Sequence, residues 1–179
     1  MEHEIRSYSD LVNSIIRPPR EEYILNDLGP TEFSIKDRKY KRSDVGLVNP
    51  QGDMIECSHF EPVDEERVNK VLPCVVFWHG NWGSRIDALP LVVALLPHNI
   101  TVFALDFAGS GRSQGDYVSL GWFEKGDLDT AIEYLRSQKT VSTIGLWGQS
   151  MGAVTCLMYA ASDPTVAGLV LDSPFSNLK

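Results

Sequence analysis

The chain has 179 residues, of which 43% are hydrophobic and 22% are charged. This composition predicts one globular domain with a buried core, and it excludes a disordered chain, a collagen and a coiled coil. The net charge of −8, from 16 basic and 24 acidic residues, argues against nucleic acid as a partner, because phosphate contacts require a positive field.

Residues 1–30 are expected to hold a helix and an extended segment. Between residues 5 and 16, apolar side chains recur at helical spacing, and Pro18 and Pro19 end the pattern. The polar face carries charges of both signs, whereas a helix that lies on a membrane usually has a basic polar face. We therefore expect residues 5–16 to pack on the protein's own body, with membrane attachment as the less favoured alternative.

Residues 31–62 are predicted to form β-structure. The segment 49–53, Asn-Pro-Gln-Gly-Asp, lies between apolar strand patterns and predicts a turn. Five basic residues between positions 36 and 42 are interpreted as a solvated strand face rather than as a phosphate-binding or nuclear-import patch.

From residue 71 onward, strand patterns alternate with helix patterns. Strands are predicted at 72–78, 100–107, 143–147 and 166–171, the first two as buried apolar runs, and helices are predicted at 86–96, 122–137 and 151–161. This alternation implies right-handed crossovers and a mainly parallel sheet flanked by helices, which is the α/β class.

The cysteines and the apolar runs indicate the cellular compartment. The three cysteines lie far apart, in no pattern typical of a disulfide framework or a thiolate metal site, so we expect a reducing compartment and no metal. No apolar run is long enough to span a bilayer, and the first residues do not resemble a signal peptide. We expect a soluble, cytoplasmic protein.

The segment Gly148-Gln-Ser150-Met-Gly152 matches the nucleophile-elbow pattern G-x-S-x-G. It follows a predicted strand and opens a predicted amphipathic helix, which is the context a nucleophilic serine requires. Small residues at both ends of the pattern allow neighbouring backbone to pass closely. The second match, at residues 111–115, lies in a loop without this context, so Ser113 is expected to be a polar loop residue.

A loop after the first buried strand, His79-Gly80-Asn81-Trp-Gly, has the position of an oxyanion loop. The backbone N–H of Asn81 could act there together with that of Met151, while His79 would shape the loop rather than serve as a base. The glycines that follow Asp106 depart from the dinucleotide fingerprint, and no G-x-x-x-x-G-K-[ST] motif is present. We expect no nucleotide cofactor.

Four sequence blocks carry a resemblance to a known family: His79-Gly-Asn with Arg85, Asp106-Phe-Ala-Gly-Ser-Gly-Arg-Ser, Gly148-Gln-Ser-Met-Gly and Asp172-Ser-Pro-Phe-Ser. In this order they resemble the α/β-hydrolase superfamily, and most of all the serine-aminopeptidase-like hydrolases. The resemblance implies that residues 31–179 are the N-terminal part of an α/β-hydrolase domain, with Ser150 as the nucleophile. It implies an oxyanion hole at Asn81 and Met151, structural residues beside the site (His79, Gly80, Arg85, Asp106, Gly148, Gly152), and hydrolysis of acyl substrates without a cofactor.

The chain departs from this family in its second half. All four histidines precede Ser150, so the catalytic acid and His of a Ser-Asp-His order are expected beyond residue 179. Asp172 is expected to cap a loop rather than to be that acid. The predicted fold is therefore incomplete at its C-terminus, and its last strand would be an unpaired edge that allows self-association.

Two functions follow from these observations. The favoured one is a serine hydrolase that cleaves an ester, thioester or peptide (amide) bond of a small-molecule or peptide substrate through a Ser150 acyl-enzyme. The alternative is a non-catalytic α/β-hydrolase-like binding module without a triad.

Overall fold

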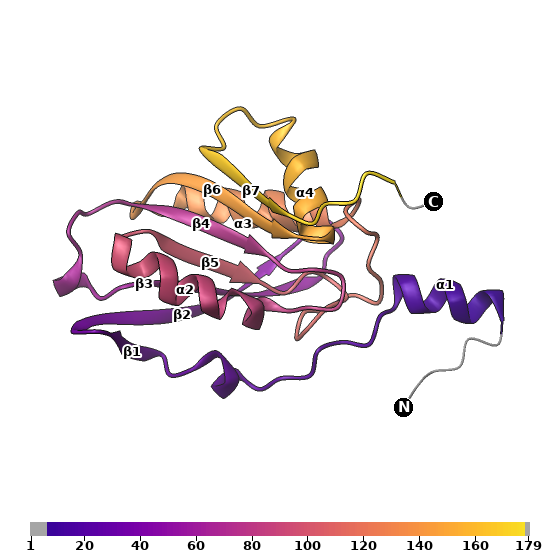
Figure 1. Cartoon of the computed structure of the whole chain (residues 1–179), viewed down its shortest axis with the longest axis horizontal. Helices are drawn as coiled ribbons and strands as arrows, with labels where there is room; N and C mark the ends of the chain where they lie inside the picture. The colour runs from indigo at the N-terminus through magenta and orange to yellow at the C-terminus, as the bar shows by residue number, and fades with distance from the viewer. Residues whose placement is uncertain (1–6, 178–179) are drawn as a thin grey trace.

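One seven-stranded sheet forms the centre of the molecule (Figure 1). The computed structural model describes residues 7–177. The strands lie in the order β1-β2-β3-β5-β4-β6-β7. Their bounds are β1 Glu32–Ile35, β2 Arg38–Val48, β3 Met54–Pro62, β4 Leu72–Trp78, β5 Thr101–Leu105, β6 Val141–Gln149 and β7 Gly168–Asp172.

The sheet is mixed. The first three strands and the β3–β5 pair are antiparallel, while β5, β4, β6 and β7 run parallel to one another. The predicted α/β class is confirmed, and the parallel arrangement covers the part of the chain where strands alternate with helices. Because parallel strands end at the same edge, the loops after β4, β5 and β6 meet at the side of the molecule from which α1 projects (Figure 1).

Helices cover both faces of the sheet. On one face lie α3 (Glu124–Ser137) and α4 (Met151–Ala160), and on the other lies α2 (Leu89–Leu95), preceded by the 3-10 turn η3 (Arg85–Ala88). The first face is packed through a larger buried cluster than the second. Its aromatic members Trp78, Phe103 and Phe107 are fully buried.

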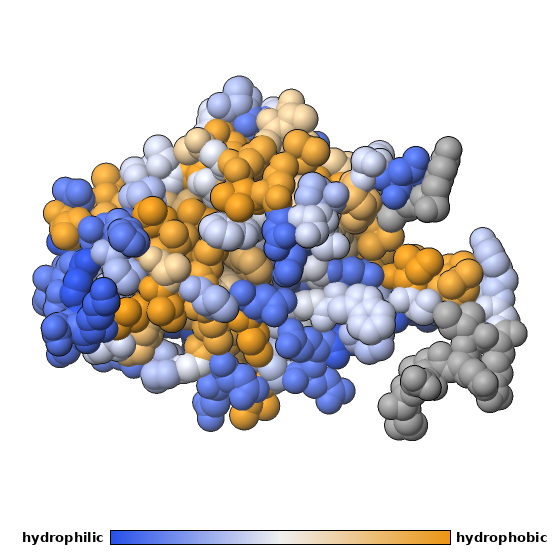
Figure 2. Space-filling view, in the orientation of Figure 1, coloured by the Kyte–Doolittle hydropathy of each residue, from blue (hydrophilic) through white to orange (hydrophobic). Residues whose placement is uncertain are grey.

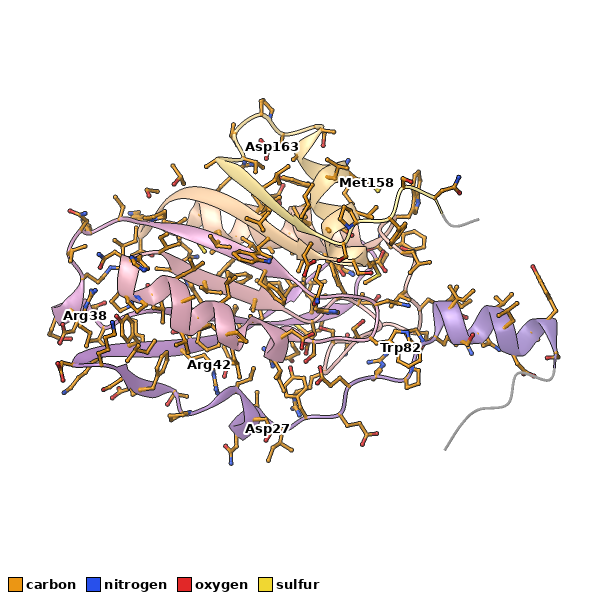
Figure 3. The ribbon with its side chains drawn as sticks, viewed as in Figure 1. Asp27, Arg38, Arg42, Trp82, Met158 and Asp163 are labelled. Carbon is orange, nitrogen blue, oxygen red and sulfur yellow. The ribbon has the colours of Figure 1, made fainter. Side chains whose placement is uncertain are left out.

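The predicted turn at 49–53 joins β2 to β3. The Asn49 side-chain oxygen accepts the backbone N–H groups of Gln51 and Asp53, at 3.0 and 2.8 Å. The interpretation of the basic cluster as a solvated face is wrong for Arg42. This side chain is buried, pairs with Asp44 and donates to the Gly29 carbonyl oxygen at 2.5 Å, so it joins β2 to the segment before β1 (Figure 3).

The N-terminal helix α1 (Tyr8–Ile16) begins at Ser7, whose hydroxyl accepts the Asp10 N–H. No residue of α1 is buried, and the helix projects from the body (Figure 1), so the prediction that it packs there is wrong. Periodicity identifies an apolar side of a helix but not what covers that side. Residue 5 lies outside the described residues.

The edge strand β7 exposes apolar side chains. Leu169 and Val170 are 38% and 44% exposed, and Figure 2 shows apolar residues gathered over β7 and α4. Self-association through β7 stays a prediction.

None of the helices in residues 7–177 has the length and apolar content needed to cross a bilayer.

Candidate active site

The predicted elbow lies between β6 and α4. Strand β6 ends at Gln149, α4 begins at Met151, and Ser150 between them has φ 51° and ψ −112°. A serine rarely adopts this backbone conformation, which costs about 1–3 kcal/mol and persists only where the surrounding structure imposes it. The Ser150 N–H donates to the Asp172 carbonyl oxygen at 2.8 Å, which joins the elbow to the end of β7.

Close backbone packing explains the glycines at both ends of the elbow. A Cβ on Gly148 would lie 2.5 Å from the Ala153 nitrogen, and a Cβ on Gly152 would lie 2.7 Å from the His79 carbonyl oxygen. The first turn of α4 therefore passes directly over β6 and the end of β4. Any larger side chain at either position would push α4 away from the sheet.

The loop after β4 lies beside Ser150. Trp78 pairs with Gly148, so β4 and β6 end side by side. A Cβ on Gly80 would lie 3.6 Å from the Ser150 Cβ, which shows how closely this loop approaches the serine. Ser150 is half-buried at the side of the sheet where β4 and β6 end, so part of this serine is accessible to solvent.

The two predicted oxyanion donors directly follow the two residues of this close contact in the sequence. Met151 is the first residue of α4, and its N–H therefore has no acceptor within the helix. Asn81 follows Gly80 directly, and its side-chain amide donates to the Ile15 carbonyl oxygen at 3.5 Å. The N-terminal end of α4 adds a positive partial charge at the position of Ser150.

His79 uses both of its ring nitrogens inside the protein. Nδ1 lies 2.6 Å from the Gly80 carbonyl oxygen, and Nε2 accepts the Phe107 N–H at 3.1 Å. Because the Gly80 carbonyl can only accept, the proton is assigned to Nδ1. Complete burial lowers the pKa of His79 below its usual value of 6.5, so the ring is neutral. A histidine with this geometry has no nitrogen free for a substrate proton.

Asp106 is a fully buried centre of hydrogen bonds at the end of β5. Its carboxylate accepts the Arg85 N–H at 2.8 Å, the Arg112 N–H at 2.9 Å and the Tyr23 hydroxyl at 2.5 Å. The Arg85 guanidinium donates in turn to the Tyr23 oxygen at 2.6 Å. Sequence patterns missed Tyr23, since a tyrosine in an extended segment carries no local signal of its partners.

The second G-x-S-x-G segment has no elbow geometry. Ser113 is buried, donates to the Asp106 carbonyl oxygen at 2.7 Å and accepts the Glu56 N–H at 2.8 Å. Its hydroxyl therefore joins two backbone segments, in agreement with the expectation of a polar loop residue.

Neither of the other described histidines lies at the site. His59 contacts the Thr101 hydroxyl at 3.1 Å, at the opposite end of β5 from the serine, and burial lowers its pKa to about 4. His98 precedes that same end of β5. Asp172 is exposed and accepts the Ser173 hydroxyl at 2.9 Å. Residues 7–177 also contain no group of three His, Cys, Asp or Glu side chains that could hold a metal ion.

Solved structures share this architecture. An esterase of Pyrococcus furiosus, Pf2001, superimposes with a TM-score of 0.70 and 25% identity, over 88% of this chain and 58% of the esterase. A hypothetical protein of Pseudomonas aeruginosa, PA2218, superimposes with a TM-score of 0.68 at 19% identity, over 88% of this chain and 49% of that protein, and shows the fold alone.

Sequence comparison identifies relatives and the family. The chain is 32% identical to Protein bem46 of Schizosaccharomyces pombe, over 60% of this chain and 36% of bem46. It is 29% identical to the monoglyceride lipase of Rattus norvegicus, over 72% of this chain and 42% of the lipase. The chain thus spans less than half the length of these relatives. The family model described as serine aminopeptidase, S33, matches residues 69–179. With this match over more than half of its length, the chain belongs to the Hydrolase_4 (serine aminopeptidase, S33) family of α/β hydrolases.

Proposed function

We propose that Ser150 is the nucleophile of an esterase-type serine hydrolase that works through an acyl-enzyme. The observation that carries this proposal is the strained backbone of Ser150 at the strand–helix junction, with Gly80 of the preceding loop packed against it. Strain of this kind lifts a hydroxyl away from the sheet and is retained where it serves function.

In the proposed reaction the Ser150 hydroxyl oxygen attacks the substrate carbonyl and forms a tetrahedral intermediate. The N–H groups of Met151 and Asn81 stabilise its oxyanion, and each such donor contributes about 10²–10³ in rate. Collapse of the intermediate releases an alcohol and leaves the acyl group on Ser150. Water then hydrolyses the acyl-enzyme and releases the acid.

The proton transfers require a base and an acid that we assign to sequence beyond residue 179. Both nitrogens of His79 are used, and His59 and His98 lie at the other end of the sheet. In this fold the triad follows the chain order serine, acid, histidine. The family match runs to residue 179, and the chain spans less than half of its curated relatives.

A carboxylic ester is the substrate class we favour. Two relatives carry names of ester hydrolases, the Pyrococcus furiosus esterase and the rat monoglyceride lipase. Thioester and peptide bonds are the other members of the predicted class, and the same acyl-enzyme chemistry would cleave them.

The test uses the protein expressed from its complete coding sequence. We expect hydrolysis of p-nitrophenyl butyrate and labelling of Ser150 by a fluorophosphonate, with the labelled peptide identified by mass spectrometry. Ser150→Ala should lower kcat by at least ~10³-fold, whereas Ser113→Ala, the matched change in the second G-x-S-x-G segment, should keep the label on Ser150.

Two outcomes would overturn the proposal. If Ser150→Ala turned over substrate at the wild-type rate, Ser150 would not be the nucleophile. If the folded protein took no label and hydrolysed no ester, thioester or aminoacyl anilide, the non-catalytic binding module would be favoured. Residues 1–179 alone should be ~10²–10⁴-fold slower than the complete protein, because general-base assistance is missing. Equal rates would place the base within residues 1–179.

A further inference from the structure

The end of α1 and the segment that follows it contact the loop after β5 and the loop after β4, and the loop after β4 lies beside the candidate nucleophile. We name residues 15–23 the N-terminal tether. It starts with the last two residues of α1, at the side of the molecule where β4 and β5 end, and it continues along the body toward β1 (Figure 1). Apart from the bonds of Tyr23, the contacts of the tether go to the loop after β5 at four positions and to the loop after β4 at one.

The tether holds the loop after β5 through backbone and side-chain bonds. The Val118 N–H donates to the Ile16 carbonyl oxygen at 2.8 Å. The Arg17 guanidinium donates to the Tyr117 hydroxyl at 2.6 Å and lies 4.5 Å from the centre of that ring. Arg20 donates to the carbonyl oxygens of residues 113 and 115, the first at 2.6 Å. These contacts span 93 or more residues of sequence, so they are tertiary restraints on the loop.

The tether also reaches the loop after β4, which carries the predicted oxyanion donor. The Asn81 amide donates to the Ile15 carbonyl oxygen at 3.5 Å, and Trp82 lies next to the end of α1 (Figure 3). Residues 79–84 are anchored at their start by the bond from Phe107 to His79 and at their end by the bond from Arg85 to Asp106.

Tyr23 completes the second anchor. Its buried hydroxyl donates to Asp106 at 2.5 Å and accepts from the Arg85 side chain at 2.6 Å. It therefore bridges the carboxylate and the guanidinium at the point where the loop after β4 ends. Without this hydroxyl, the buried carboxylate of Asp106 and the buried guanidinium of Arg85 each lose a hydrogen-bond partner. This loss weakens the contact that fixes the end of the loop after β4.

We propose that the tether is a positioning element for the oxyanion hole and that Tyr23 is its main positioning residue. This inference rests on the proposed function, since it assigns the loop at 79–84 to oxyanion binding. Tyr23 touches no reacting atom. It acts through Asp106 and Arg85, which set the place of the Asn81 N–H, and an error of about 1 Å in such a donor can cost 10²-fold in rate.

The experiment compares Tyr23→Phe and Arg20→Ala with the wild type, in the protein expressed from its complete coding sequence. Tyr8→Phe is the matched control, because Tyr8 is 82% exposed on α1. Amide hydrogen exchange is followed by mass spectrometry at 79–84, at 108–118 and in α4. Ester turnover gives kcat and KM separately.

We expect Tyr23→Phe to speed exchange about tenfold at 79–84 and Arg20→Ala to do so at 108–118, with α4 and the control unchanged. Tyr23→Phe should lower kcat about tenfold and change KM less than twofold, because the donor acts in the transition state. Unchanged amide exchange in both variants would overturn the claim that the tether restrains the loops. Faster exchange with unchanged kcat would overturn the claim that this restraint positions the oxyanion hole. If Tyr23→Phe does not fold, Arg20→Ala decides by the same two measurements. If the wild type has no turnover, the proposed function fails, while the exchange result still decides whether the tether holds the loops.

Discussion

Gly152→Ala tests the packing that places the nucleophile. A Cβ at this position would meet the backbone of β4, with the His79 carbonyl oxygen at 2.7 Å, whereas ordinary van der Waals contact begins at 3.4 Å. No rotamer relieves a contact with backbone, so α4 must move away from the sheet. Overpacking of this kind costs about 1–3 kcal/mol, and the better helix propensity of Ala returns about 1 kcal/mol. Because the Cβ would meet the carbonyl groups of both Trp78 and His79, we take the upper end of the overpacking cost and expect a net loss of about 2 kcal/mol.

Urea unfolding of the chain, followed by circular dichroism, measures this loss. A change of about 2 kcal/mol corresponds to a fall of about 4–8 °C in Tm for a chain of this length. Gly168→Ala is the control, because a Cβ there would meet no atom within 4 Å, and it should stay within about 0.5 kcal/mol of the wild type. A Gly152→Ala variant as stable as the wild type would refute the close approach of α4 to β4.

Three further predictions concern single side chains. Ser150→Gly should stabilise the fold by about 1 kcal/mol in urea unfolding, because glycine relieves the strain at φ 51°, and Ser150→Ala should give no such gain. Ser113→Ala should cost about 1–3 kcal/mol by the same assay, since the Glu56 N–H loses its acceptor; an unchanged midpoint would contradict the contact. Burial raises the pKa of Asp127 from 3.8 to about 7, so the folded protein holds a proton that the unfolded chain releases, and the stability from this group is lost as pH rises from about 4 to 7. Asp127→Asn should flatten that part of the profile of Tm against pH, and parallel profiles would contradict the assignment.

Several features of the fold could be predicted because their causes are local. The apolar run at 72–78 and the turn residues at 49–53 impose their conformations through neighbours in the sequence, and both predictions are confirmed. The predicted strand before residues 148–152 and the predicted helix after them indicate that this G-x-S-x-G match is the elbow and the match at 111–115 is not. The structure shows those elements directly before and after Ser150, whose backbone has a positive φ of 51°.

Other features depend on partners that are distant in the sequence. Arg42 belongs to a charged cluster in the sequence, yet the structure buries it against backbone carbonyls that precede β1. Tyr23 lies 83 residues from its partner Asp106, and no spacing or periodicity connects them. The periodicity of α1 predicts an apolar face packed on the protein body, yet no residue of the helix is buried.

By itself the sequence determined the α/β class, the order of the strands and helices, and the identity of the candidate nucleophile, because backbone propensity and hydrophobic periodicity act over a few residues. Only the tertiary structure decided that His79 has no free nitrogen, that Ser113 joins two backbone segments and that the residues before β1 contact the loops after β4 and β5. Hydrogen bonds and close packing between distant segments form when the sheet assembles, and their partners leave no local pattern in the chain.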